Sequence, residues 1–113
     1  MIISCIIPYF NEEENIIYTL NQLLNQTYKS KEIIFINSNS YDNSPKIVKN
    51  FISNVDLNIK NFDTNIQSAS EAKNFGIEKS NFEWLAFMDC DMSFDEFWLE
   101  KQVTFANRFP NKS

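Results

Sequence analysis

Four short apolar runs, each followed by a segment with helical periodicity, are the feature that most narrows the folds open to this chain. The first two runs, IISCII at 2–7 and EIIFIN at 32–37, are mainly apolar and rich in isoleucine without alternation, which is typical of strands buried on both faces of a sheet. The run at 57–62 alternates and predicts a more exposed strand. Strands that alternate with helices predict a parallel sheet with helices on both faces.

Local signals place the boundaries of these elements. Pro8 is expected to end the first strand, and Asn11 with Glu14 three residues later resembles a helix capping box. We expect the third helix to bury Ala69, Ala72, Gly76 and Ile77. The expected strands are 2–7, 32–37, 57–62 and 83–89, and the expected helices are 11–26, 45–52, 68–80 and 94–109.

No repeat, linker or low-complexity tract interrupts this pattern, so the sequence predicts a single domain over 1–113. The expected fold class is α/β, a three-layer α/β/α sandwich with a mainly parallel sheet in the strand order 3-2-1-4. Because the chain ends straight after a helical segment, we expect the natural protein to continue beyond Ser113, which makes this a truncated domain.

Composition excludes several kinds of site. The chain has no histidine, which excludes histidine acid–base chemistry and Ser-His-Asp triads. Its one glycine, Gly76, excludes both a P-loop and a G-x-G-x-x-G loop. The net charge of −5 without a basic stripe argues against a nucleic-acid partner.

The sequence also predicts a cellular location. Cys5 and Cys90 lie on separate apolar segments without metal-type spacing and are expected to be reduced, partly buried thiols. No apolar run reaches the roughly 20 residues that a membrane span needs, and the first residues lack a basic start. We expect a cytoplasmic protein, with the inner face of the membrane as a second location.

Three polar loops follow predicted strands, at 8–12, 37–42 and 89–91. In a parallel sheet the carboxyl ends of the strands share one edge, and ligands bind there at the point where the strand order reverses. With the order 3-2-1-4 the reversal falls between the first and fourth strands. The sequence therefore predicts that the three loops border a common crevice.

Asp89 and Asp91 carry the most distinctive chemistry. On an extended segment their side chains point the same way, with Cα atoms about 6.5–7 Å apart. One carboxylate can then hold Mg²⁺ or Mn²⁺ while the other takes a ribose hydroxyl or a metal-bound water. The alternative is an ordinary solvated turn after a strand.

The other loop residues each have two interpretations. The 37–42 loop can read a base or ribose edge, or it can be a turn held by its own Asn, Ser and Asp side chains. Phe10 can stack on a base or pack on the first helical turn. Glu12 can be a partner of the helix dipole, and Lys73 can offset phosphate charge or be solvated.

A series of motifs in this chain resembles the family 2 glycosyltransferases over essentially its whole length. In the family these motifs read S-x-I-I-P-x-Y-N-E, L-L-x-Q-T-Y, an acidic residue before the second strand, D-D/S-x-S-x-D, A-R-N-x-G-I and D-x-D. Here they are SCIIPYFNE at 4–12, LLNQTY at 23–28, Glu32, NSNSYD at 37–42, AKNFGI at 72–77 and DCD at 89–91.

The resemblance implies the Rossmann-like GT-A fold and a function. It implies transfer of a sugar from a nucleotide-diphosphate sugar, with a UDP-sugar as the expected donor, to a hydroxyl of a saccharide or lipid-linked acceptor. It further implies an inverting mechanism, a divalent Mg²⁺ or Mn²⁺ cofactor and a role in surface polysaccharide or glycolipid synthesis. The implied catalytic base lies beyond Ser113. The implied donor-binding residues are Pro8, Phe10, Asn11, Glu12, Asn37, Ser38, Ser40, Lys73 and Asp89, and the implied metal ligands are Asp91 and Asp89.

Three residues depart from the family pattern. Asn37 replaces the first aspartate of the second loop and is neutral, which puts the base preference in question. Phe10 lacks the hydroxyl of the usual tyrosine. Lys73 replaces arginine and keeps the charge without the planar bidentate geometry.

Two other functions compete with this one. A non-catalytic nucleotide-sugar-binding fragment or interaction module is the main alternative, because the sequence offers no candidate for the catalytic base. A phosphoacceptor receiver domain is disfavoured, since it needs acids at the end of the first strand and an aspartate on the third. Pro8 and the acid-poor LNIKNF segment occupy those positions.

Overall fold

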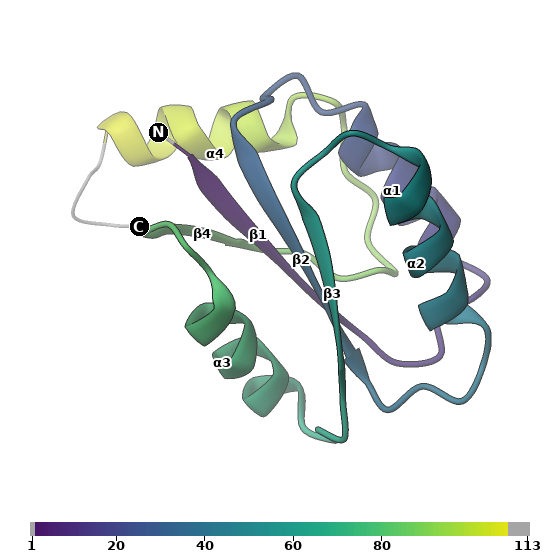
Figure 1. The fold of residues 1–113 in the computed structure, drawn as a ribbon. Coiled ribbons are helices and arrows are strands. Elements are labelled where there is room, and N and C mark those ends of the chain that lie inside the picture. The colour runs from purple at the N-terminus through teal and green to yellow at the C-terminus, as the bar shows by residue number, and fades with distance from the viewer. Residues whose placement is uncertain (1, 109–113) are drawn as a thin grey trace.

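The computed structural model describes residues 2–108 and contains the predicted alternation of strands and helices (Figure 1). The strands are β1 (Ile3–Tyr9), β2 (Lys31–Ser38), β3 (Ile59–Thr64) and β4 (Trp84–Phe87). The helices are α1 (Ile16–Leu24), α2 (Ser44–Asn54), α3 (Ala69–Lys79) and α4 (Trp98–Arg108). Pro45 lies in the first turn of α2, where its missing N–H costs no hydrogen bond.

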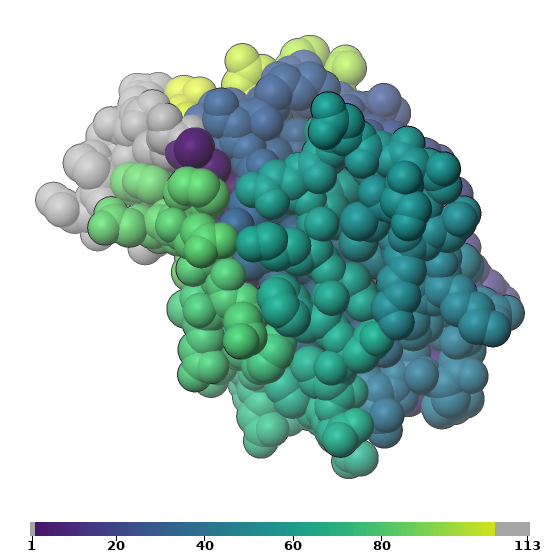
Figure 2. Space-filling view, viewed as in Figure 1, coloured from purple at the N-terminus to yellow at the C-terminus, as the bar shows by residue number. Residues whose placement is uncertain are grey.

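The four strands form one parallel sheet in the order β3-β2-β1-β4, as predicted. β1 is central and pairs with β2 from Ile3–Lys31 to Tyr9–Asn37. On its other side β1 pairs with β4 from Ile3–Trp84 to Ile6–Phe87. Every residue of β1 is buried except Pro8, which is partly buried. On the side shown in Figure 2, only a small dark purple area near the N-terminus reaches the surface.

Helices cover both faces of the sheet, which confirms the three-layer arrangement (Figure 1). Cys5, Ile7 and Phe35 face the larger core, which α1, α2 and α4 complete. Ile6, Ile34 and Ile36 face the opposite way and pack with α3. This division follows from the period of two in a strand, because successive side chains point to opposite faces. Within residues 2–108, no helix combines the length and the apolar character needed to cross a membrane.

The inner face of α3 is narrower than predicted. Ala72 and Gly76, four residues apart, are buried against the sheet, as expected. Ala69 and Ile77 were expected to be buried too, but both are exposed, and Ile77 keeps 41% of its surface. The reason is close packing at Gly76, where an added Cβ would lie 2.5 Å from Ile6 Cγ2 and 2.6 Å from Ile36 Cδ1. A helix this close to the sheet contacts it along a thin stripe only.

Pro8 does not end the first strand, contrary to the prediction. β1 continues through Pro8, opposite Ile36, to Tyr9. The N–H of Ile3 donates to Ser30 O on the β2 side, and alternate residues of a parallel strand turn their N–H groups to the same neighbour. The nitrogen of Pro8 therefore faces the β4 side, beyond the last β1–β4 pair at Ile6 and Phe87. A strand tolerates proline where no ladder bond is lost.

The start of α1 also differs from the prediction. The helix begins at Ile16 after Asn15, which makes no side-chain capping bond, so the capping box of Asn11 and Glu14 is wrong. Asn11 has a φ of 50° and lies in the preceding loop. Its side chain is engaged by another loop, described below. The carbonyl of Glu12 accepts from the N–H groups of Asn15 and Ile16, which closes the first turn.

Two buried glutamines explain why α4 starts at Trp98 instead of residue 94. Gln22 Oε1 accepts from the Phe94 N–H, and Gln26 Oε1 accepts from the Leu99 N–H at 3.0 Å. Gln26 also donates to the Asp95 carbonyl at 2.8 Å. These bonds keep residues 94–97 outside the helix, in a segment that ends in a turn at 96–97. The predicted helix end at Phe109 lies outside the described residues.

Glu32 at the start of β2 is a buried carboxylate, 1% exposed, that joins three segments. It accepts hydrogen bonds from the Ser4 hydroxyl at 3.0 Å, the Asn81 N–H at 3.0 Å and the Asn81 amide at 2.6 Å. Burial by itself raises the pKa of Glu32. The hydrogen bonds from Asn81 and Ser4 and the charge of the Lys60 ammonium, 3.9 Å away, lower it by more than burial raises it. The pKa of Glu32 therefore lies below its ordinary value.

Replacing Gly76 by alanine is expected to destabilise the fold by about 1 kcal/mol or more, because the loss from overpacking against Ile6 and Ile36 exceeds the helix propensity gained. The measurement is the free energy of unfolding by urea. Asn74→Ala, an exposed position on the same helix, is the matched control and should be neutral or stabilising. An unchanged or higher stability for Gly76→Ala would contradict the close packing.

Glu32→Gln is expected to lower the free energy of unfolding at pH 7 by about 2 kcal/mol, because one amide donor then faces the donors of Asn81 and Ser4. The folded pKa of Glu32 is depressed, so its stabilisation is complete above the unfolded pKa of about 4.3 and is lost as the pH falls through the folded pKa. The gap between the two proteins should therefore close on acidification. Glu83→Gln, which changes an exposed glutamate in the segment between α3 and β4 that also contains Asn81, is the control. A gap that is equally large at pH 3 would refute this account.

Candidate functional site

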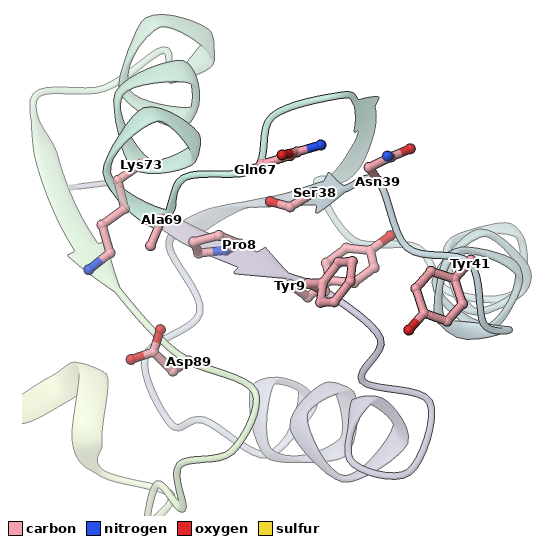
Figure 3. Close-up of a pocket in the computed structure, with 10 residues that line it drawn as sticks. Pro8, Tyr9, Ser38, Asn39, Tyr41, Gln67, Ala69, Lys73 and Asp89 are labelled. Atoms are coloured by element: carbon pink, nitrogen blue, oxygen red, sulfur yellow. The ribbon is translucent and has the colours of Figure 1, made fainter.

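A pocket of about 690 Å³ lies at the carboxyl ends of the strands, where the sequence predicted a crevice. β1, the loop after β2, the start of α3 and the segment after β4 all contribute to its wall (Figure 3). The residues that line it are Pro8, Tyr9, Phe10, Ser38, Asn39, Tyr41, Gln67, Ala69, Lys73 and Asp89. The first, second and fourth strands therefore deliver side chains to one cavity.

The pocket gathers part of the predicted donor site. Of the residues expected there, five line the pocket, namely Pro8, Phe10, Ser38, Lys73 and Asp89. The others, Asn11, Glu12, Asn37, Ser40 and Asp91, are not among its lining residues. Four of the residues that do not line the pocket instead make hydrogen bonds within the loops that support it, namely Asn11, Glu12, Asn37 and Ser40.

Asn37 at the end of β2 is buried, 6% exposed, and its amide has partners on both sides. Its Oδ1 accepts from the Ser40 N–H at 2.9 Å, and its Nδ2 donates to Asp63 Oδ1 on β3 at 3.0 Å. Asp63 in turn pairs with Lys49 at 2.6 Å. The hydrogen bond from Lys49, followed by that from Asn37, lowers the pKa of Asp63. The Asn37 side chain thus holds the turn that begins the second loop.

Asn11 joins the first loop to the second. Its Oδ1 accepts from the backbone N–H groups of Tyr41 at 3.0 Å and Asp42 at 3.3 Å. Its own N–H donates to Ser40 Oγ at 3.0 Å. The left-handed φ of 50° turns the Asn11 backbone into this position, a conformation that asparagine tolerates better than most residues.

Further reciprocal bonds strengthen this junction. The Glu12 N–H donates to Ser44 Oγ at 3.2 Å, and the Glu13 N–H donates to Asp42 Oδ2 at 3.1 Å. Asp42 also accepts from both the N–H and the hydroxyl of Ser44. Slight burial raises the pKa of Asp42, but the bonds from Ser44 and Glu13 outweigh it and lower the pKa below its ordinary value. The loop after β1 and the loop after β2 therefore behave as one supported rim.

Asp89 and Asp91 lie on a turn, which corrects the expectation of an extended segment. β4 ends at Phe87, and the Met92 N–H donates to the Asp89 carbonyl at 3.1 Å. The Cα separation expected for extended backbone therefore does not apply. Asp89 lines the pocket, and both carboxylates are exposed.

Cys90, between the two aspartates, is buried at 4% exposure. Burial is the main cause that raises the pKa of this thiol to about 12, and the carboxylates of Glu12, Asp89 and Asp91 raise it further. A hydrogen bond with Thr19 opposes these effects without cancelling them, so the thiol is neutral near pH 7. Both cysteines are free and buried, in agreement with the reduced state that the sequence predicted.

Oxygen ligands at the Asp89–Asp91 turn suit a hard divalent cation. Among residues 2–108, no group of three or more His, Cys, Asp or Glu side chains is placed to hold a metal ion. Mg²⁺ and Mn²⁺ sites at phosphate substrates commonly use one or two protein carboxylates and complete the shell with phosphate oxygens and water. The two exposed aspartates fit that kind of site and do not fit a closed protein cage.

The two ends of the pocket differ in chemistry. Lys73 extends from α3 toward the end where Asp89 lies, and Tyr41 is at the other end, with Pro8 and Ser38 between them (Figure 3). The Lys73 Nζ is 5.8 Å from the centre of the Phe87 ring. No carboxylate within the described residues forms an ion pair with Lys73. Its charge is therefore available to an anionic ligand.

Sequence reasoning missed five of the lining residues, Tyr9, Asn39, Tyr41, Gln67 and Ala69. Asn39 and Tyr41 lie within the polar loop that was singled out, so the loop was the available signal. Gln67 and Ala69 carry no distinctive local pattern. They reach the pocket because α3 begins at the carboxyl edge of the sheet, shortly after β3 ends at Thr64.

Two solved structures share this architecture. The S. aureus protein TarS, residues 1–349 in complex with UDP-GlcNAc, matches with a TM-score of 0.82 and 24% identity over 96% of this chain and 32% of that chain. The mannosyltransferase PcManGT from Pyrobaculum calidifontis, in complex with GDP-Man and Mn²⁺, matches with a TM-score of 0.74 and 22% identity over 79% of this chain and 27% of that chain. At these identities the likeness shows the common GT-A fold.

Sequence relatives are more similar. Glycosyltransferase AglE of Haloferax volcanii is 38% identical over 104 residues, which cover 90% of this chain and 34% of the relative. Poly-beta-1,6-N-acetyl-D-glucosamine synthase of Staphylococcus epidermidis is 33% identical over 94 residues, which cover 83% of this chain and 23% of the relative. The chain thus spans about a third or less of the length of these relatives. The model of the family described as glycosyl transferase family 2 matches residues 4–112, and the chain belongs to that family.

Proposed function

We propose that this chain is the nucleotide-sugar-binding domain, over 1–113, of a glycosyltransferase that moves a sugar from a nucleotide-diphosphate donor to an acceptor hydroxyl. The observation that carries the proposal is the pocket at the strand ends, with the aromatic pair Phe10 and Tyr41 at one end and Lys73 and Asp89 at the other. A nucleoside diphosphate has the same polarity, with a flat base at one end and a charged diphosphate at the other.

Each part of the pocket has a proposed task. Pro8, Phe10 and Ser38 contact the nucleoside, and Lys73 offsets the negative charge of the diphosphate. Asn11, Glu12, Asn37 and Ser40 act mainly by holding the two loops, because their hydrogen bonds run within and between the loop after β1 and the loop after β2. This moves the second group from direct ligand contact, as the resemblance implied, to support of the ligand-binding loops.

The proposed reaction is a direct displacement at the anomeric carbon. An acceptor hydroxyl forms the new C–O bond, the bond to the diphosphate oxygen breaks with its electron pair, and a base takes the hydroxyl proton. Attack opposite the leaving group inverts the anomeric configuration. Asp91, with Asp89, would hold Mg²⁺ or Mn²⁺, which when bound supplies positive charge to the departing diphosphate. Lys73 adds positive charge on the same side of the pocket.

The catalytic base is not assigned. Asp89 is the one carboxylate that lines the pocket within residues 2–108, and it is committed to the diphosphate end. This observation supports a second candidate function, a domain that binds the donor without transferring the sugar. Binding and turnover separate the two: donor affinity without transfer supports the second candidate, and transfer to an acceptor supports the first.

The named relatives suggest the classes of donor and acceptor. A UDP-sugar is the proposed donor, since one neighbour of known structure was solved with UDP-GlcNAc, although another was solved with GDP-Man. A saccharide or lipid-linked acceptor, in surface polysaccharide or glycolipid synthesis, is proposed from relatives named as a poly-beta-1,6-N-acetyl-D-glucosamine synthase and a cholesterol galactosyltransferase.

Adding Mn²⁺ is expected to strengthen UDP-sugar binding, and Asp91→Asn is expected to reduce this gain in affinity at least tenfold. The reason is that a neutral amide is a poorer ligand for a hard cation than a carboxylate. The measurement is titration calorimetry with UDP-, GDP- and dTDP-sugars, with and without Mn²⁺. Asp56→Asn, an exposed aspartate between α2 and β3, is the control and should not change binding. Equal Mn²⁺ dependence in Asp91→Asn and the unchanged protein would remove Asp91 from the metal site.

Lys73→Met is expected to weaken UDP binding about tenfold and to leave uridine binding unchanged, because the lost interaction is with the diphosphate charge. Raising the salt concentration should reduce the difference between the two proteins. Lys46→Met, an exposed lysine on α2, serves as the control. An equal loss of affinity for uridine and UDP would mean that Lys73 supports the pocket shape and not the phosphate.

A further inference from the structure

Tyr41 is an unusually exposed aromatic residue at the rim of the pocket. It keeps 85% of its surface accessible, and its hydroxyl has no hydrogen-bond partner among the described residues. A single exposed aromatic residue on a surface needs no special explanation. Tyr41 differs because it lines the pocket and contacts Phe10, which is itself 50% exposed.

The backbone around Tyr41 is held more firmly than its exposure suggests. The Tyr41 N–H donates to Asn11 Oδ1 at 3.0 Å, and its neighbours Ser40 and Asp42 are both bonded to the first loop. Asn39, two residues earlier, has a φ of 63°, so the loop turns sharply before the ring. The ring is therefore presented by a supported loop and is not simply left on a loose one.

The contact between the two rings leaves aromatic surface unused. Phe10 and Tyr41 meet edge to face, with ring centres 5.8 Å apart and planes at 80°. In a perpendicular pair each ring shields only part of the other, and the remaining faces are open to solvent. Ser38, Asn39 and Gln67 line the same pocket and supply groups that can bond the edge of a base or ribose. The cationic Lys73 lies at the opposite end (Figure 3).

We propose that Tyr41 is a binding residue for the nucleobase, providing with Phe10 two perpendicular aromatic walls against which the base of a nucleoside diphosphate stacks. The inference rests on the proposed function and deepens it, since it names the residue that recognises the base. Stacking uses the ring face, so the interaction accepts more than one base and strengthens with base size. The Tyr41 hydroxyl is dispensable for it.

The test is calorimetric binding of UDP, GDP and inorganic pyrophosphate, each with Mn²⁺, to Tyr41→Ala and Tyr41→Phe. Relative to the unchanged protein, Tyr41→Ala should bind UDP about tenfold more weakly, and its loss of affinity for GDP should be larger than that for UDP. Its affinity for pyrophosphate should not change. Tyr41→Phe should bind all three ligands like the unchanged protein. Leu57→Ala, which truncates an exposed apolar side chain just before β3 and outside the pocket lining, is the control. The melting temperature of each variant shows whether the fold is preserved.

The possible outcomes are separable. If the unchanged protein binds UDP and GDP and Tyr41→Ala binds them equally well, the role of Tyr41 is overturned and the proposed function stands. If Tyr41→Ala loses pyrophosphate affinity as much as UDP affinity, the residue supports the loop and the base-stacking role is overturned. If the unchanged protein binds neither UDP nor GDP, the proposed function fails and this inference fails with it.

Discussion

Parallel pairing of β1 with β2 on one side and β4 on the other is the interaction on which the whole site depends. Because the three strands run the same way, their carboxyl ends meet at one edge, and the segments that follow them must leave from that edge. Residues as distant in sequence as Pro8 and Asp89 line one pocket for this reason. The burial of β1 on both faces makes the pairing strong, since a slip of one residue would turn its apolar side chains to the wrong layers.

Asparagine performs in this chain much of the conformational work that glycine performs elsewhere. The chain has a single glycine, and it is used where α3 approaches the sheet. Within residues 2–108, the residues with a left-handed backbone are Asn11 and Asn39. Asparagine accepts that backbone and also carries an amide, which Asn11 uses to bind the second loop. The same residue type thus turns the chain and stabilises the turn, which glycine cannot do.

The pocket and its support are made by different residues. Ser38, Lys73 and Asp89 face the cavity, whereas the amides and hydroxyls of the first two loops bond each other. Such a division suits a site that must keep its shape when the ligand leaves, because the supporting bonds do not involve the ligand. It also accounts for motif residues of the family that do not line the pocket. Their place in the motif is consistent with holding the binding loops as well as with touching a donor.

Sequence pattern was sufficient for the strand order, the three layers and the edge of the sheet where the pocket lies, because hydrophobic periodicity and the crossover of parallel strands leave few alternatives. It was insufficient for the course of Pro8 and the capping of α1, where contacts with distant residues overrode local preferences. It also could not choose between an extended segment and a turn at Asp89–Asp91, where the Met92 N–H donates to the Asp89 carbonyl. Asn11 illustrates the difference. Its spacing to Glu14 suits a helix cap, but its side-chain oxygen Oδ1 instead accepts from the backbone N–H groups of Tyr41 and Asp42, about 30 residues later. A residue's partners depend on which segments folding brings within hydrogen-bond reach, and that distance is not written in local sequence.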